Sequence, residues 1–311
     1  METINQTEAQ ALPEDVVRIE KLIYGGDGLA RHHGKVVLTP FVLPGELVRI
    51  TPAEQKRSFL RGTPSEILEP APGRTDPPCP VFGQCGGCQY QHAQYEVQLE
   101  QKKAILIEAL ERIGKLNLTL EPDVVSAEPW GYRNRAQFHL ERGRIGYLEA
   151  GSNRLVPIEE CPIVAPRINE ALTALRRMQK DRRFPQFVRQ LELFTNGELT
   201  LLNVLKTEGG KHVARGFFEW AAEEIKGADL GAIGYIAASE RFRVSHGSFF
   251  QVNRFLIDRL VDLAVGDASG GHAVDLYAGV GLFTVPLARR FSRVMAVEST
   301  RSASYDLEAN A

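Results

Sequence analysis

The set of four cysteines constrains this chain more than any other feature, because three of them fall in one ten-residue segment. The segment reads Cys79-Pro-Val-Phe-Gly-Gln-Cys85-Gly-Gly-Cys88, and the fourth cysteine, Cys161, lies far along the chain and is also followed by proline. The two glycines before Cys88 allow the backbone to turn tightly enough to aim the three thiols at one point. Four cysteines can bind zinc or an iron–sulfur cluster. Structural zinc usually has two close pairs of ligands, so a triplet with one distant cysteine favours the cluster.

Length and composition indicate a soluble protein of two or three domains, since the chain has 311 residues and ordinary hydrophobic content. No apolar run approaches the length of a membrane span, and the polar, acidic stretch from Met1 to Glu14 is unlike a signal peptide. We therefore expect a cytoplasmic protein. Reducing conditions there favour metal-bound thiols over the alternative, a disulfide between Cys85 and Cys88.

The overall charge does not by itself indicate a nucleic-acid-binding protein, because 37 basic and 39 acidic residues leave a formal charge of −2. Basic residues do gather in three local clusters: Arg49, Lys56, Arg57 and Arg61; Arg133, Arg135, Arg142 and Arg144; and Arg176, Arg177, Lys180, Arg182 and Arg183. Each cluster is either a phosphate-binding patch or an ordinary solvated face.

The N-terminal part of the chain predicts a small all-β domain. Residues 1–14 are expected to form a disordered lead-in, and residues 15–70 the domain itself, in which glycine and proline punctuate short β runs. Four strands are predicted: Val16–Ile19, Lys35–Thr39, Glu46–Thr51 and Ser65–Leu68. An OB-like barrel is the most economical architecture for such a span, although the fold alone would not establish nucleic-acid binding.

Residues 71–245 form a second predicted domain, of α+β character. A proline-rich linker over residues 70–78 leads into the cysteine segment, and apolar residues at helical spacing predict a helix over Tyr95–Ile113 that Gly114 ends. The remaining predicted elements are strands over Tyr132–Leu140, Ile145–Glu149 and Arg154–Pro157, a helix over Pro166–Met178, and a hairpin of Phe187–Thr195 and Glu198–Leu205 joined at Asn196-Gly197.

Residues 246–311 predict the start of a doubly wound, Rossmann-like α/β domain. The predicted order is a helix over Phe255–Val265, a strand over His272–Tyr277, a helix over Leu282–Phe291, a strand over Val294–Val297 and a helix from Arg301. A single β–α–β unit cannot bury its sheet on both faces. We therefore expect that the chain is C-terminally truncated.

A nucleotide-binding turn is predicted between the first strand and helix of this α/β part. The turn reads Asp275-Leu-Tyr-Ala-Gly279-Val-Gly281, and Glu298 ends the next strand, where an acid can bind ribose hydroxyls. A dinucleotide fingerprint would have a third glycine where Thr284 stands, so the pattern favours S-adenosylmethionine over NAD. The alternative is a Rossmann-like turn without a ligand.

Four motifs together resemble one family: Cys79-x5-Cys85-Gly-Gly-Cys88-Gln-x-Gln91-His92 with the distant Cys161-Pro162; Tyr132-Arg-Asn-Arg135; Ser248-Phe-Phe-Gln251-Val-Asn253; and Asp275-Leu-Tyr-Ala-Gly-Val-Gly281. The chain resembles, from about Val16 to its end, the iron–sulfur-containing RNA (uracil-C5)-methyltransferases, whose bacterial members with these features mostly act on 23S rRNA. The resemblance implies that the N-terminal barrel is an RNA-gripping TRAM domain and that the partner is RNA, with no membrane and no protein partner.

The resemblance also implies the site residues. Cys79, Cys85, Cys88 and Cys161 would hold a [4Fe-4S] cluster with a structural role, and S-adenosyl-L-methionine would contact Gln251, Tyr277, Gly279, Gly281 and Glu298. Phe249 would pack on the target uracil, and Arg133 and Arg135 would contact phosphate or brace the domains. For Phe249 the alternative is a core aromatic beside Phe250. His92 and His139 are expected to be surface or hydrogen-bonded histidines.

The implied reaction is covalent: a cysteine thiolate adds to C6 of uracil, the enolate attacks the methyl group of S-adenosylmethionine, and a base removes the C5 proton as the cysteine leaves. All four cysteines are assigned to the cluster, so the nucleophilic cysteine and the glutamate base are expected beyond Ala311 and this chain is expected to be inactive. Ala278 and Leu282 depart from the cysteine and asparagine of many relatives, and the loss of a polar side chain at Leu282 would remove one hydrogen bond to the cofactor. Alternatives are Cys161 as nucleophile beside a three-cysteine cluster, a zinc protein, and an RNA-binding module without transferase activity.

Overall fold

A computed structural model describes residues 13, 15–56 and 58–311 of the chain, and the predicted lead-in over residues 1–14 lies almost wholly outside them. The chain divides into two compact units, Met1–Val125 and Ser126–Ala311. Each unit has its own sheets and its own core, so each is described by itself.

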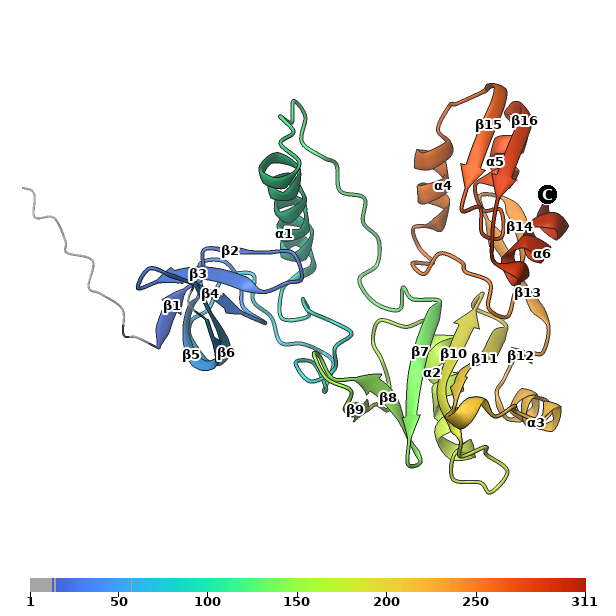
Figure 1. The fold of residues 1–311 in the computed structure, drawn as a ribbon, viewed down its shortest axis with the longest axis horizontal. Coiled ribbons are helices and arrows are strands. Elements are labelled where there is room, and N and C mark those ends of the chain that lie inside the picture. Colours follow the sequence, from blue (N-terminus) through green and yellow to red (C-terminus); the bar gives the residue numbers. More distant parts are fainter. Residues whose placement is uncertain (1–12, 14, 57) are drawn as a thin grey trace, which may run out of the picture. The chain divides into compact units, whose positions relative to one another are not determined.

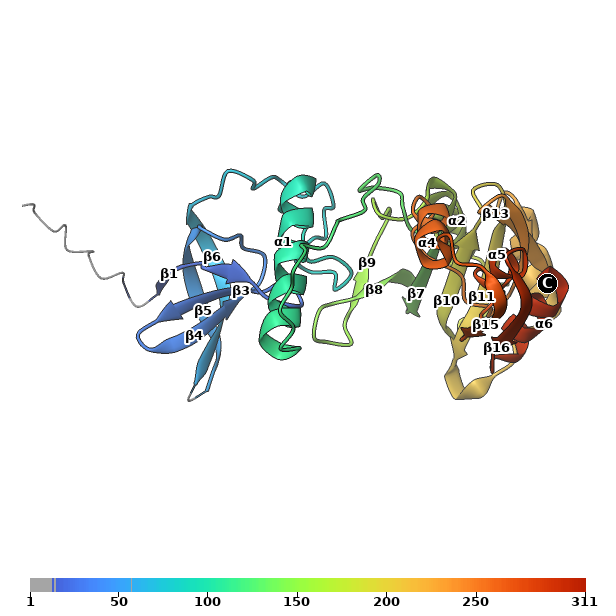
Figure 2. The ribbon, with the colours of Figure 1, turned by 90° about the horizontal axis from the view of Figure 1, so that it is seen from above.

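The first unit is built on a curved six-stranded sheet (Figure 2). Its strands are β1 (Val16–Arg18), β2 (Lys21–Leu22), β3 (Gly28–His32), β4 (Lys35–Thr39), β5 (Leu47–Gln55) and β6 (Phe59–Glu69), in the spatial order β1-β5-β6-β4-β3-β2. The two ends of this order are consecutive stretches of chain separated only by Ile19 and Glu20, so the sheet curves back toward its own start. Closure into an OB-type barrel stays a prediction.

Alternating apolar residues fill the concave side of this sheet, as the period of two in a half-buried strand requires. The buried core consists of Val17, Ile19, Ala30, Val37, Val42, Val48 and Ile50. Gly28 allows this packing, because a Cβ there would lie 2.4 Å from Cγ2 of Val42. All four predicted strands are confirmed, but β2 and β3 were missed and β5 and β6 extend well beyond their predicted ends.

The predicted linker and the cysteine segment belong to this first unit. Leu22, Leu43 and Ala93 form a second small core, against which the helix α1 (Tyr95–Glu108) packs through Val97 and Ile105. A short π-helical turn, η1 (Ala109–Ile113), continues α1 to Gly114, which confirms the predicted helix. The domain boundary expected at 70/71 therefore does not coincide with the division between the compact units, which follows residue 125.

The buried carboxylate of Glu46 joins the sheet to the segment that follows it. Glu46 is fully buried, and its two oxygens accept hydrogen bonds from the backbone N–H of Leu43 (2.8 Å) and of Ala71 (3.2 Å). Nε of Arg74 lies 2.9 Å from Oε1 of the same carboxylate, and Nη2 of Arg74 donates to the Phe41 carbonyl. These bonds fix the start of the chain that leads to the cysteines.

The second unit has a six-stranded sheet in the order β12-β11-β10-β7-β8-β9 (Figure 1). The strands are β7 (Arg135–Glu141), β8 (Arg144–Leu148), β9 (Leu155–Pro157), β10 (Val188–Thr195), β11 (Thr200–Thr207) and β12 (Ala228–Asp229). The helix α2 (Pro166–Met178) buries its apolar face against β10 and β11. The predicted sheet, helix and β10–β11 hairpin are confirmed, whereas α3 (Arg215–Glu224), β12 and a 3-10 turn, η2 (Glu208–Gly210), were missed.

A hairpin and a β–α–β unit complete the second unit. The elements are β13 (Ala232–Ala237), β14 (Glu240–Ser245), α4 (Ile257–Val265), β15 (Gly270–Leu276), α5 (Thr284–Ala288), β16 (Phe291–Val297) and α6 (Arg301–Asn310). β15 and β16 are parallel, so the predicted β–α–β order is confirmed. α5 is shorter than predicted at both ends, because the glycine turn extends to Phe283 and β16 already begins at Phe291. Val274, Leu276, Met295 and Val297 leave much of this small sheet exposed. None of the helices in the described part of the chain is long and apolar enough to cross a membrane.

Replacing Glu46 with alanine should lower the free energy of unfolding of the first unit by about 2–4 kcal/mol, because two buried N–H donors and a guanidinium lose their acceptor. The measurement is urea denaturation followed by circular dichroism. Glu66→Ala is the control, because the Glu66 side chain is 58% exposed in its ion pair with Arg49 and should contribute within about 0.5 kcal/mol. Equal effects of the two substitutions would contradict the role of Glu46.

Candidate functional site

Two of the motifs singled out in the sequence lie against each other in the second unit. The backbone N–H of Asn134 donates to the Val252 carbonyl at 3.0 Å, and Arg133 forms a β-bridge with Asn253. The Asn134 side chain is buried, and its Nδ2 donates to the Gln251 carbonyl at 2.9 Å and lies 3.2 Å from the Tyr235 hydroxyl. Residues 132–135 therefore fix the backbone of residues 251–253.

Arg135 braces the same junction from its place at the start of β7. Its Nη1 donates to Oε1 of Glu192 at 2.8 Å, its Nη2 donates to the Ser248 carbonyl at 2.7 Å, and its guanidinium lies 4.4 Å from the centre of the Phe194 ring. Burial lowers the pKa of Arg135, and Glu192 opposes that shift. The alternative of a solvated face is thus wrong for Arg135. The Arg133 guanidinium, by contrast, makes no hydrogen bond or ion pair with the described residues.

The two aromatic residues of the motif at 248–253 differ in burial: one lies in the core and the other is exposed to solvent. Phe250 is 1% exposed and packs among Phe194, Tyr235 and Phe242. Phe249 is 60% exposed, so it is not a core residue. A Cβ added to Gly279 would lie 4.0 Å from the Phe249 carbonyl oxygen, which places the backbone of the exposed phenylalanine beside the glycine turn.

The glycine turn follows β15, and three of its residues have positive backbone φ angles. Tyr277, Gly279 and Gly281 have φ of 60°, 57° and 92°, and the Tyr277 side chain is 91% exposed. The φ of Gly281 is the reason for glycine there, and a Cβ would in addition displace Cδ1 of Leu307, which lies 2.8 Å from its position. Thr284, which stands where a dinucleotide fingerprint has glycine, donates from Oγ1 to Oδ2 of the buried Asp275 at 2.5 Å.

Glu298 links this turn to the start of α6. Its Oε2 accepts from the Gly279 N–H at 2.9 Å, and its Oε1 accepts from the N–H groups of Ser299 (2.9 Å) and Thr300 (2.6 Å). These hydrogen bonds, that of Thr300 foremost, lower the pKa of Glu298. The Thr300 side chain also bonds to this carboxylate, and Glu298 is only partly buried, so a ligand can still reach it.

The two departures from the family pattern, Ala278 and Leu282, are both buried. Leu282 lies in the same core cluster as Phe250 and Val280. Its side chain therefore packs in the interior, where a polar asparagine would need buried partners.

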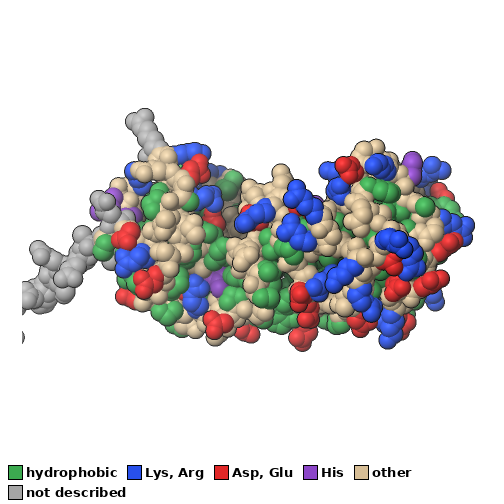
Figure 3. All heavy atoms as spheres, turned by 90° about the horizontal axis from the view of Figure 1, so that it is seen from below, with side chains coloured by type: hydrophobic (Ala, Val, Ile, Leu, Met, Phe, Trp, Pro, Cys, Tyr) green, Lys and Arg blue, Asp and Glu red, His purple; other side chains and the backbone are tan. Residues whose placement is uncertain are grey.

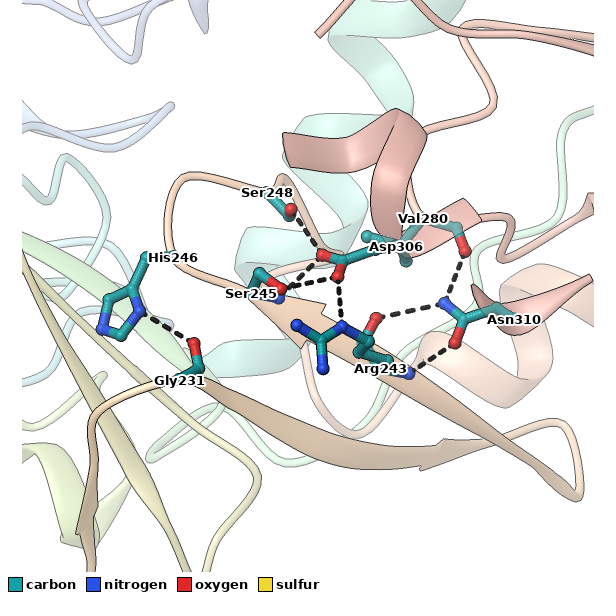
Figure 4. A network of polar contacts seen from close by, with 8 residues as sticks. All are labelled: Gly231, Arg243, Ser245, His246, Ser248, Val280, Asp306 and Asn310. Atoms are coloured by element: carbon teal, nitrogen blue, oxygen red, sulfur yellow. Dashed lines mark hydrogen bonds and ion pairs between the residues drawn. The ribbon is translucent and has the colours of Figure 1, made fainter. Parts of the chain in front are cut away.

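A buried polar network that the sequence did not indicate anchors α6 to β14 (Figure 4). The fully buried carboxylate of Asp306 accepts from Nε of Arg243, from both N–H and Oγ of Ser245, and from Oγ of Ser248. Asn310, one turn later, exchanges hydrogen bonds with the Arg243 backbone and donates to the Val280 carbonyl at 2.8 Å. The only sequence signal is the i, i+4 spacing of the two polar residues on one helix face.

The cysteine segment is a series of tight turns in the first unit. The N–H of Cys85 donates to the Val81 carbonyl at 2.9 Å, and the N–H of Gly87 donates to Sγ of Cys85 at 3.4 Å. Such N–H···S bonds are typical of metal-bound thiolates. The thiols of Cys79, Cys85 and Cys88 are half-buried. In the described ranges, no group of three or more Cys, His, Asp or Glu side chains is arranged to hold a metal ion, so the cluster stays a prediction.

The fourth cysteine, Cys161, is buried in the second unit just before α2. The side chain of Asn169 in α2 clamps its backbone, because Oδ1 accepts from the Cys161 N–H at 3.0 Å and Nδ2 donates to the Cys161 carbonyl at 3.1 Å.

The two histidines weighed in the sequence have different surroundings. His92 is 2% exposed, its Nε2 lies 3.2 Å from the Val42 carbonyl oxygen, and its ring contacts Phe41 and Phe82. The contact with Val42 confirms a hydrogen-bonded histidine, and burial lowers the pKa of His92 from 6.5 to about 4. His139 lies half-buried in β7, where burial lowers its pKa as well.

Much of the three basic clusters is neutralised by neighbouring acids. Arg49 pairs with Asp15 and Glu66, Arg176 with Glu159, and Arg183 with Asp181. Figure 3 shows basic and acidic side chains interspersed over the face it presents. These members of the clusters therefore match the alternative of a solvated, paired surface.

Comparison with known proteins agrees with this combination of an exposed aromatic segment and a glycine turn of the methyltransferase type. The family described as tRNA (Uracil-5-)-methyltransferase matches residues 236–311. An uncharacterized RNA methyltransferase of Aquifex aeolicus is 35% identical over 312 residues, which cover 94% of this chain and 73% of that protein. The 23S rRNA (uracil(1939)-C(5))-methyltransferase RlmD of Shewanella amazonensis is 30% identical, over 94% of this chain and 71% of that protein.

A solved structure shares the fold. The tRNA (uracil-54, C5)-methyltransferase of Pyrococcus abyssi, in complex with S-adenosyl-L-homocysteine, superposes with a TM-score of 0.70 at 22% identity, covering 96% of this chain and 76% of that one. The architecture is thus that of a mixed α/β methyltransferase with several sheets. The chain belongs to the RNA (uracil-C5)-methyltransferases, a family of enzymes.

Protonation of His92 should make the first unit less stable in mild acid. The folded pKa of about 4 lies below the ordinary value of 6.5, so the unfolded chain binds the proton first and stability falls as pH drops from 6.5 to 4. The loss is at most about 3 kcal/mol. Urea denaturation at several pH values should show that His92→Gln, a neutral replacement, flattens this dependence. Parallel curves for the two proteins would contradict the assignment.

Proposed function

We propose that this chain carries the RNA-binding and cofactor-binding parts of a cytoplasmic enzyme that methylates C5 of uracil in 23S rRNA with S-adenosyl-L-methionine. The observation that carries the proposal is the pairing of residues 132–135 with residues 248–253, which sets an exposed Phe249 beside the turn at Gly279. Relatives about 30% identical over most of this chain are named for that reaction on 23S rRNA.

The glycine turn and Glu298 fit the methyl donor. Gly279 leaves the backbone of the turn open, because a Cβ there would meet no side chain within 4 Å, and the partly exposed carboxylate of Glu298 would accept from a ribose hydroxyl. Tyr277 is exposed at the turn, and the half-buried Gln251 lies on the segment that carries Phe249. The bound donor would supply an electrophilic methyl group. The Pyrococcus abyssi enzyme was solved with the demethylated form of this cofactor, which supports the same class of ligand.

Phe249 and Arg133 fit the RNA. An exposed aromatic ring can stack on a base that has left its helix, a common way of recognising single-stranded RNA. The Arg133 guanidinium lacks partners among the described residues and is available for a phosphate. Arg135, held by Glu192 and Ser248, would brace this surface. The N-terminal sheet would add RNA contacts as an OB-like TRAM barrel.

The four cysteines fit a [4Fe-4S] cluster in the chemistry of their donors. Three thiols lie in one loop of tight turns, and one of them already accepts an N–H···S hydrogen bond. The backbone clamp of Asn169 fixes Cys161, the proposed fourth ligand. With four protein ligands the group would have a structural role.

The chemistry would follow the covalent route. A thiolate would add to C6 of uracil, which makes C5 nucleophilic enough to take the methyl group of S-adenosyl-L-methionine with release of S-adenosyl-L-homocysteine. A base would then remove the C5 proton while the C6–S bond breaks and the thiolate leaves. We assign neither the nucleophile nor the base to a residue of this chain, because its four cysteines are assigned to the cluster. The chain alone would therefore bind both ligands without turnover.

Isothermal titration with S-adenosyl-L-homocysteine tests the cofactor assignment. The chain should bind it, and Glu298→Ala should weaken binding about 10- to 100-fold, since a charged hydrogen bond contributes roughly 1.5–3 kcal/mol. Glu308→Ala, an exposed acid on α6, is the matched control and should bind as the unchanged chain does. Equal affinities of all three proteins, or no binding by a folded chain, would favour an RNA-binding module without transferase activity.

Anaerobic purification tests the cluster. The protein should be brown and contain iron and acid-labile sulfide, and Cys161→Ala should lose both. Stoichiometric zinc without iron would remove the cluster assignment and leave the zinc alternative.

A further inference from the structure

We propose that Ser248, held between Asp306 and Arg135, is a positioning residue that fixes Phe249 in the orientation that binds the target base. The proposal rests on the proposed function, because it assigns a role to residues behind the exposed aromatic.

Ser248 is held by hydrogen bonds at its side chain and at its backbone carbonyl. Its side chain is fully buried, and its Oγ donates to Oδ2 of Asp306 at 2.6 Å. Its carbonyl accepts from Nη2 of Arg135 at 2.7 Å. The two grips come from α6 and from β7, elements far apart in the sequence, so the residue before Phe249 cannot rotate without breaking a buried, charge-assisted hydrogen bond.

The Asp306 carboxylate is a rigid anchor for this grip. It receives four donors, two at each oxygen: Nε of Arg243 (3.0 Å) and Oγ of Ser245 (2.6 Å) at Oδ1, and the Ser245 N–H (2.7 Å) and Oγ of Ser248 at Oδ2 (Figure 4). All its acceptor positions are thereby filled. A buried carboxylate with complete hydrogen bonding has one arrangement only, because any rotation would leave donors unsatisfied.

The residue after Phe249 is fixed as firmly. Phe250 packs in the core, and Asn134 holds the Gln251 carbonyl. The exposed Phe249 ring therefore projects from a backbone that is immobilised on both sides. Ordering this segment before RNA arrives removes an entropic cost from binding, which is the advantage of a preorganised site.

The same helix also fixes the glycine turn. Nδ2 of Asn310 donates to the Val280 carbonyl, and Glu298, just before α6, accepts from the Gly279 N–H. α6 is thus hydrogen-bonded both to the residue before Phe249 and to the glycine turn, and fixes their relative positions. Asp306 holds the segment proposed to bind RNA, and Asn310 and Glu298 hold the turn proposed to bind the cofactor.

Two serine variants separate positioning from stability. Ser245→Ala and Ser248→Ala each remove one hydroxyl bond of 2.6 Å to the same carboxylate, but only Ser248 adjoins Phe249. Both should lower the free energy of unfolding equally and leave S-adenosyl-L-homocysteine affinity unchanged. Affinity for a fluorescein-labelled single-stranded oligouridylate should fall about fivefold in Ser248→Ala, as for one lost hydrogen bond, and less than about twofold in Ser245→Ala.

A double-mutant cycle with Phe249→Ala tests whether Ser248 acts through the ring. Phe249→Ala alone should weaken RNA binding more than Ser248→Ala does, since base stacking contributes about 1–3 kcal/mol per base, equivalent to about 5- to 150-fold. In the Phe249→Ala background, Ser248→Ala should have no further effect on RNA affinity.

The outcomes distinguish a failure of the positioning role of Ser248 from a failure of the proposed function. If the unchanged chain binds RNA but the two serine variants are equal, or if Ser248→Ala still weakens binding without the ring, the positioning role is overturned and the proposed function stands. If the folded chain binds no RNA, the proposed function is contradicted and the positioning role falls with it.

Discussion

The rest of the site depends on the buried hydrogen bonds by which Asn134 and Arg135 hold residues 248–251. Asn134 fixes the Gln251 carbonyl, and Arg135 fixes the Ser248 carbonyl while its charge is compensated by Glu192. Burying a guanidinium is costly unless it is paired and hydrogen-bonded. Once paired, it becomes a constraint that allows one arrangement of the neighbouring loop. That constraint holds the backbone on which the exposed Phe249 lies.

A second constraint comes from α6. Asp306 is buried and fully hydrogen-bonded, so the loop after β14 and the helix cannot move separately. Both constraints meet at Ser248, one at its carbonyl and one at its hydroxyl. The site is therefore assembled from three parts of the second unit: the start of β7, the loop after β14, and the β–α–β unit with its glycine turn. None of the three would define the position of Phe249 alone.

The sequence predicted the parts of the fold that local patterns determine. The β10–β11 hairpin follows from Asn196-Gly197 between two β runs, and α2 from its apolar spacing and its N-terminal proline. The short strands β2 and β3 were missed because glycines at 25, 26 and 28 break the alternation that identifies a strand. The contacts of Glu46 with Ala71 and Arg74, which hold the start of the predicted linker against the first sheet, are long-range and leave no local pattern.

For the site, the sequence motifs predicted Phe249, Arg135 and Glu298 as functional residues, but they did not predict which neighbours hold these side chains in place. Whether Phe249 or Phe250 is exposed depends on the core formed by Phe194, Tyr235 and Phe242, which the motif does not contain. The partners of Arg135 come from β10 and from the loop after β14. Asp306 carries no signal except its spacing from Asn310. Positions buried by tertiary contacts are decided by residues distant in sequence, so a single sequence names the residues without their geometry.

Photocross-linking tests most directly the claim that the loop after β14 presents Phe249 to the base. A single-stranded RNA with 4-thiouridine at one position would be irradiated with the chain, and the attached peptide identified by mass spectrometry. The account predicts a cross-link within residues 248–251 that Phe249→Ala reduces strongly. Cross-links confined to residues 16–69, unaffected by Phe249→Ala, would contradict it.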